Sequence, residues 1–245
     1  MACYTRSIIN CPAYAMIEKT RLAKYLAHAG ICSRKQASRL IEQGIVTVNA
    51  HPANHIDHVD DSDDIRVNGE RIQGAAPLVY FAYHKPVGID CKLNQTDSSS
   101  LIHHLPQTTR VYPIGRLDKD SRGLLILTND GEFCNQLVHP DFHQPKRYLV
   151  TVDKPLNDNF CQTMANGVPV DKHITLPCTV EKITEHQFSI ILKQGLNRQI
   201  RKMAHYCGYK VTDLYREQIA HLELTPLNLA ENSYQQINKS DILKN

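Results

Sequence analysis

Residues 112–131 constrain the fold of this chain more than any other stretch, because a polar loop there runs directly into an apolar strand. The loop carries Asp118 two residues after Arg116. The run Leu124–Leu127 that follows has the composition of a buried strand. Asp118 therefore lies at the edge of a predicted sheet. A carboxylate in this position is available for chemistry, although most loop aspartates are ordinary surface residues.

The net charge of +3 over 245 residues is too small to indicate a nucleic-acid partner, but its distribution is uneven. Residues 20–50 carry five basic residues against one acidic residue, and residues 51–70 carry six acidic residues against one basic residue. A small unit with one basic and one acidic portion is expected if its basic face binds phosphates. Two amphipathic helices with an ordinary solvated face explain the charge pattern equally well.

The same segment contains helix and turn signals. Thr20 is expected to cap a helix over residues 22–29, where apolar residues recur at helical spacing. Ser33 and Gln36 have the spacing of a capping box and predict the start of a second helix. A strand follows, and Asn68-Gly69 predicts a hairpin turn after it.

The pattern of the remaining chain predicts a larger second domain. Residues 73–77 are small and end in a proline, which is typical of a linker. After them, strands are predicted near residues 78–83, 124–128, 148–152 and 188–193. Helical patterns lie between and after these strands, so we expect an α+β fold with a small module in front of a larger α+β domain.

Two further groups of residues suggest a functional surface. Tyr148 follows Lys146 at the start of a predicted strand, where a tyrosine is usually core or sheet surface. Asn197 is expected to cap a helix whose cations share one face, and these cations are Arg198, Arg201 and Lys202. Three cations within five residues repel one another unless an anion neutralises them. An RNA phosphate or a carboxylate could be that anion. A solvated amphipathic helix is the simpler interpretation of the pattern.

The segment Gly115-Arg-Leu-Asp-x-x-Ser-x-Gly-Leu124 resembles the signature of the pseudouridine synthases that modify ribosomal RNA. The resemblance implies that Asp118 is the catalytic carboxylate, that Tyr148 lies against the target base, and that Arg201 pairs with Asp118. It further implies that Arg116 contacts phosphate or helps to flip the base, and that Arg198 and Lys202 hold the RNA backbone. The family's Asn-Lys-Pro-x-Gly element is present with His84 in place of the asparagine.

Residues 21–49 are similar to the S4 RNA-binding domain, with the helix, glycine, Cys-Ser-Arg and Gly-x-Val-x-Val-Asn elements in order. This similarity implies that the RNA-facing side carries the basic and polar residues Arg21, Lys24, Ser33, Arg34, Lys35 and Arg39.

Together these resemblances imply an α+β protein with an S4-type module and a synthase domain that has a mostly antiparallel central sheet flanked by helices. Residues 194–201, 205–209 and 151–155 look most like the RluF subgroup, which acts on 23S ribosomal RNA. The implied reaction isomerises uridine to pseudouridine and needs no cofactor and no metal. Three alternatives remain: an inactive S4-bearing RNA-binding or ribosome-assembly factor, a synthase that acts also on tRNA, and a hydrolase that pairs Asp118 with Asp120.

We expect residues 1–19 to be a disordered or non-native extension with a native start at Met16, residues 20–72 to be the S4 domain, residues 73–77 the linker and residues 78–245 the catalytic domain. The eight scattered cysteines contain no Cys-x-x-Cys pair, which favours reduced cytoplasmic thiols over a zinc site or disulfides. No signal peptide or membrane span is indicated. The expected protein is a cytoplasmic monomer.

Overall fold

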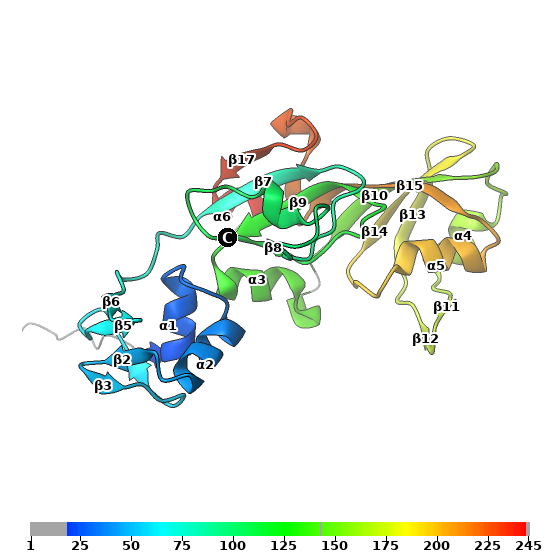
Figure 1. Ribbon diagram of the computed structural model, residues 1–245. Helices are drawn as coiled ribbons and strands as arrows, with labels where there is room; N and C mark the ends of the chain where they lie inside the picture. The colour runs from blue at the N-terminus through cyan, green and yellow to red at the C-terminus, as the bar shows by residue number, and fades with distance from the viewer. Residues whose placement is uncertain (1–18, 143, 244–245) are drawn as a thin grey trace, which may run out of the picture. The chain divides into compact units, whose positions relative to one another are not determined.

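The computed structural model describes residues 19–142 and 144–243 (Figure 1). The predicted start at Met16 and nearly all of the predicted N-terminal extension lie outside these residues. The chain divides into two compact units between Ala76 and Pro77. Both units contain helices packed on antiparallel strands, and the predicted α+β fold class is confirmed.

The first unit packs two helices and two small sheets around one apolar core. Helix α2 begins with the predicted capping box, in which the Ser33 hydroxyl accepts from the Gln36 amide at 3.2 Å. The prediction for Thr20 is wrong: Thr20 pairs with Val59 in a short ladder, and the helix begins after Arg21 without a side-chain cap. The elements are β1 (Thr20–Arg21), α1 (Leu22–His28), α2 (Arg34–Glu42), β2 (Val46–Val48), β3 (His51–Pro52), β4 (His58–Val59), β5 (Ile65–Val67) and β6 (Glu70–Arg71).

The second unit is built on one large twisted sheet. Among the described residues this sheet has nine strands, seven of them in the order β13-β14-β10-β15-β9-β7-β17, with β8 added beside β9 and β16 beside β15. All pairings are antiparallel except the one between β9 and β15. The strands are β7 (Tyr80–Lys85), β8 (Tyr112–Ile114), β9 (Arg122–Thr128), β10 (Lys146–Val152), β11 (Pro169–Val170), β12 (His173–Ile174), β13 (Thr179–Lys182), β14 (Gln187–Leu192), β15 (Val211–Ile219), β16 (Leu222–Glu223) and β17 (Tyr234–Ile237), with β11 and β12 forming a separate hairpin.

Helices cover two parts of this sheet with separate apolar cores. One core joins α4 and α5 to β10, β14 and β15, and a second joins α3 and α6 to β7 and β9. Asp130 caps α3 by accepting from the amides of Glu132 and Phe133. The α-helices are α3 (Gly131–Val138), α4 (Phe160–Ala165), α5 (Gln199–Tyr206) and α6 (Lys239–Ile242), and the 3-10 helices are Leu101–His104, Pro140–Phe142 and Thr225–Leu227.

The parallel pairing of β9 with β15 brings the loop before β9 against the middle of the sheet. Gly123 pairs with Arg216 at this point and has a φ of +111°. A Cβ atom on Gly123 would lie 2.3 Å from the carbonyl oxygen of Arg216. A glycine is therefore required here both for its backbone conformation and for the close approach of the two strands.

We predict that Gly123→Ala destabilises the second unit by about 3 kcal/mol or more, because the new methyl group meets backbone that cannot move independently. Gly195→Ala is the matched control, since nothing lies within 4 Å of a Cβ there and its φ is negative. Chemical denaturation of both variants tests this. Equal midpoints for the two variants would contradict it.

Candidate active site

Asp118 lies in the loop between β8 and β9, at the junction of two cavities. Its side chain is 29% exposed, so the carboxylate is neither buried among leucines nor free in solvent. The amide of Ser121 donates to the Asp118 carbonyl at 3.0 Å and closes a turn immediately behind the carboxylate. The larger cavity has a volume of about 440 Å³ and is lined by both Asp118 and Tyr148. The structure thus presents Asp118 toward a space that a nucleotide base could occupy.

The guanidinium nearest to Asp118 belongs to Arg198. Its Nη1 lies 3.7 Å from the Asp118 carboxylate, while both of its terminal nitrogens donate to Asp120 at 2.8 and 3.2 Å. Arg198 has left-handed backbone angles, and helix α5 begins at the next residue. The predicted cap at Asn197 is therefore wrong by one position. With this backbone conformation, the Arg198 side chain reaches the loop that carries Asp118 and Asp120.

Arg201 contacts the loop behind Asp118 rather than the Asp118 carboxylate. Its Nη2 donates to the Asp120 carbonyl at 2.7 Å and to the Ser121 hydroxyl at 3.2 Å, and its Nη1 donates to the Val211 carbonyl at 3.2 Å. The expected pairing of Arg201 with Asp118 is corrected here. The physical reason is that Arg201 is held on the buried side of the loop, where backbone oxygens lie closer than the carboxylate.

Asp120 is the carboxylate that these two arginines share. Arg201 Nε lies 3.5 Å from the Asp120 carboxylate, in addition to the hydrogen bonds from Arg198. The hydrogen bonds from Arg198 hold the pKa of the Asp120 carboxyl below its ordinary value. A glycosidase pair needs one carboxyl that keeps its proton as general acid. Asp120 does not meet that requirement, which argues against the hydrolase alternative.

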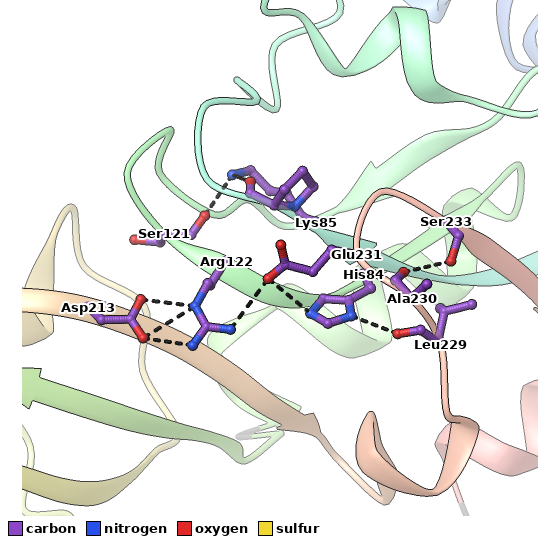
Figure 2. Close-up of polar contacts among 10 residues, drawn as sticks. His84, Lys85, Ser121, Arg122, Asp213, Leu229, Ala230, Glu231 and Ser233 are labelled. Carbon is purple, nitrogen blue, oxygen red and sulfur yellow. Dashed lines mark hydrogen bonds and ion pairs between the residues drawn. The ribbon is translucent and has the colours of Figure 1, made fainter.

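Lys85 holds the same loop at Ser121 from another strand, β7 (Figure 2). It is fully buried, and its ammonium donates to the carbonyls of Ser121 at 2.7 Å and of Pro86 at 2.9 Å. In the sequence, Lys85 is the lysine of the Asn-Lys-Pro-x-Gly-like element that begins at His84. The distance of 36 residues between Lys85 and Ser121 hides this contact from any local pattern.

Arg122 forms an internal ion-pair network beside the loop. It donates to both oxygens of Asp213 at 2.8–3.2 Å, approaches Glu231 at 3.5 Å, and lies over the Tyr215 ring. Figure 2 shows Arg122 between the two carboxylates, with His84 on the far side of Glu231. These partners hold the start of β9 against β15, so Arg122 supports the loop from behind.

Tyr148 and Arg116 line the cleft from opposite elements. Tyr148 comes from β10, at the register position opposite Arg216 on β15. Arg116 is exposed and, like Tyr148, lines two neighbouring cavities. The structure brings Asp118, Arg198, Tyr148 and Arg116 to one cleft, with Arg201 beneath it.

Lys202 does not join this cleft. Its ammonium pairs with Asp171 at 2.6 Å, in the turn between β11 and β12. This pair fastens helix α5 to the hairpin. In the first unit, Arg21, Arg34, Lys35 and Arg39 are exposed, while Lys24 and Ser33 are half-buried.

Two more cations, Lys146 and Arg216, lie under the cleft. Arg216 is 2% exposed, and its Nε donates to the Leu124 carbonyl at 2.7 Å. Lys146 donates to the Gln144 carbonyl at 3.1 Å. Burial, and then the neighbouring charge of Arg216, lowers the pKa of Lys146 to about 8. The fold therefore holds two positive charges close together, and the hydrogen bonds described for them are to carbonyl oxygens.

Within residues 19–142 and 144–243, no group of three His, Cys, Asp or Glu side chains could hold a metal ion. Across the same residues, no helix is long and apolar enough to cross a membrane. The six cysteines in this part of the chain are not joined in disulfides.

Comparison with known proteins agrees with this geometry. Residues 79–206 match the RNA pseudouridylate synthase family, and residues 20–65 match the S4 domain. The chain is 44% identical over 214 residues to a dual-specificity RNA pseudouridine synthase RluF from Salmonella typhi, covering 86% of this chain and 74% of the relative. The chain belongs to the RNA pseudouridylate synthase family.

Two other similar proteins are covered by this chain over nearly their whole length. It is 36% identical to ribosomal large subunit pseudouridine synthase B of Bacillus subtilis, over 86% of this chain and 90% of that protein. A crystal structure of a pseudouridylate synthase superimposes with a TM-score of 0.66 and 27% identity, over 91% of this chain and 97% of the other. The expected S4-type module and mostly antiparallel synthase fold are confirmed.

We predict that Lys146→Met stabilises the free synthase by about 1–2 kcal/mol at pH 7, because it removes a charge that is costly to bury. Lysine in the unfolded chain has a pKa of about 10.4, above the folded value of about 8. Between these two pKa values, Lys146 binds more protons in the unfolded chain than in the folded protein. The free energy of unfolding of the wild type therefore rises with pH in this range, and that of the variant does not. The difference should therefore disappear above about pH 10.4.

Urea denaturation at pH 7 and at pH 10.5 tests this, with exposed Lys210→Met as the control. A variant that is less stable than wild type at pH 7 would contradict the assignment of a buried, costly charge.

Proposed function

We propose that this synthase isomerises uridine to pseudouridine in ribosomal RNA, with 23S RNA as the main substrate and Asp118 as the catalytic carboxylate. The observation that supports this most is the position of Asp118 in a cleft between Arg198 and Tyr148. The RNA class is supported by relatives named for the ribosomal large subunit and for dual specificity. A relative is named for dual specificity, so a second RNA substrate is to be tested, and tRNA is the proposed candidate.

In the proposed reaction the C1′–N1 bond of the target uridine breaks, the base turns, and C5 bonds to C1′. The proton leaves C5, and N1 gains a proton, so that the product is an isomer of the substrate. The nucleotide must leave its stack to reach Asp118, at a cost of a few kcal/mol. Phosphate contacts from the cleft and from the first unit can offset this cost.

Each residue of the cleft has a proposed role that follows from its contacts. Asp118 acts on the target nucleotide, and Arg198, whose Nη1 lies 3.7 Å from this carboxylate, helps to orient it. Tyr148 can stack on uracil, which is worth about 1–3 kcal/mol, and it is placed to assist proton removal from C5. Arg116 contacts phosphate or the flipped base. Arg201 is a positioning residue, because it holds the loop through the backbone of Asp120.

The first unit is proposed to bind RNA phosphates through Arg21, Lys24, Ser33, Arg34, Lys35 and Arg39. Contacts of this kind supply affinity and position the protein without reading sequence.

We predict that Asp118→Asn lowers the single-turnover rate of pseudouridine formation by at least about 1,000-fold, because the amide cannot carry the negative charge. RNA affinity should change less than about threefold, since Asp118 is one group in a large contact surface. Asp158→Asn, an exposed aspartate outside the cleft, is the matched control. Pseudouridine formation by Asp118→Asn at more than a tenth of the wild-type rate would rule out the assignment.

We predict that replacing Arg34, Lys35 and Arg39 by glutamine weakens RNA binding and makes it less dependent on salt. Each lost phosphate contact reduces the slope of log K against log salt by about 0.7–0.9. The rate at saturating RNA should stay unchanged. The control replaces Arg66 and Arg71, which pair with Asp64. Equal salt slopes for the two variants would contradict the proposed role of helix α2.

A further inference from the structure

A further cavity shares Tyr148 and Arg116 with the larger of the two cavities that Asp118 lines. It has a volume of about 380 Å³, and Tyr148, Arg116, Lys146 and Arg216 contribute to its wall. Asp118 does not line this cavity, and the described wall residues include no Asp or Glu. The space is therefore bordered by cations without a carboxylate to balance them.

Arg216 has an incomplete set of hydrogen bonds. Its Nε is bonded to the Leu124 carbonyl, but its Nη2 is buried and has no hydrogen-bond partner among the described residues. A buried donor without a partner is costly, and a charged donor more so. A native fold tolerates such a group where a ligand completes its bonds.

Lys146 adds a second charge to the same wall. Its one described hydrogen bond is to the Gln144 carbonyl. Burial, and then the charge of Arg216, lowers the pKa of its ammonium, and the described wall residues offer no carboxylate to either cation. An anion in the cavity would neutralise both charges at once.

We propose that Arg216 and Lys146 form an anion subsite that binds a negatively charged oxygen of the RNA next to the target base. This proposal rests on the proposed function, because it requires RNA in the Asp118 cleft. Two sources of such an oxygen exist. One is a backbone phosphate that flanks the flipped nucleotide. The other is uracil itself, which carries negative charge on its carbonyl oxygens after the C1′–N1 electron pair leaves with the base.

Lys146→Met is the decisive variant, because it removes the charge while keeping the apolar stem. Arg216→Lys keeps the charge and removes the guanidinium fork with its Nη2 donor. Lys210→Met removes an exposed cation that does not line the cavity and serves as the control. The measurements are the Kd for a ribosomal RNA fragment at several salt concentrations and the single-turnover rate at saturating RNA.

A phosphate ligand predicts a Kd at least about 10-fold higher for Lys146→Met, a salt slope lower by about 0.7, and an unchanged rate. A uracil ligand predicts an unchanged Kd and a rate at least about 10-fold lower. Either pattern supports the subsite. Arg216→Lys should show the same change in Kd or in rate, but with an unchanged salt slope, because it keeps its charge.

Values of both Kd and rate within twofold of wild type for Lys146→Met would overturn the proposal, whatever Arg216→Lys shows. A loss of activity accompanied by a lower melting temperature would assign a structural role to Lys146 and overturn it as well. Failure of the wild-type protein to form pseudouridine would instead count against the proposed function.

Discussion

The candidate site depends on how the short loop between β8 and β9 is held. Arg201 reaches it from helix α5 and donates to the Asp120 carbonyl and the Ser121 hydroxyl. Lys85 reaches it from β7 and donates to the Ser121 carbonyl. Cationic donors from two elements thus close the loop at one point. Charge-assisted hydrogen bonds are stronger than neutral ones, so these contacts fix the backbone of the loop. The fixed backbone in turn holds the carboxylate of Asp118 in position.

The same arrangement concentrates positive charge around a single cleft. Arg198 and Arg201 are balanced in part by Asp120, whereas Lys85, Lys146 and Arg216 are bonded to carbonyl oxygens. Buried cations without carboxylate partners reduce stability. An RNA substrate brings phosphates and a polar base to this region, so the charges that are costly in the free protein favour the bound state. The folded protein is therefore less stable because of the same positive charges that favour RNA binding at the cleft.

Local signals in the sequence predicted the elements well and the contacts between them poorly. The capping box of Ser33 and Gln36 and the strand that follows Asp118 were predictable, because each depends on a few neighbouring residues. The start of helix α5 was misplaced because Arg198 adopts a left-handed conformation that favours glycine or asparagine. The predicted partner of Arg201 was wrong, and the ion pairs of Arg122 were not predicted, because spacing on a helix or strand gives a direction but not a distant partner. Asp213 and Glu231 lie about 90 to 110 residues from Arg122.

The central claim is that the held loop presents Asp118, and not Asp120, to the target nucleotide. A crystal structure of the Asp118→Asn variant with a short RNA that contains the target uridine tests it most directly. We expect a flipped uridine against the Tyr148 ring, with the residue-118 side chain within about 3–3.5 Å of the sugar or base atoms that react. A uridine still stacked in the RNA, or one that contacts Asp120 while residue 118 points away, would contradict it.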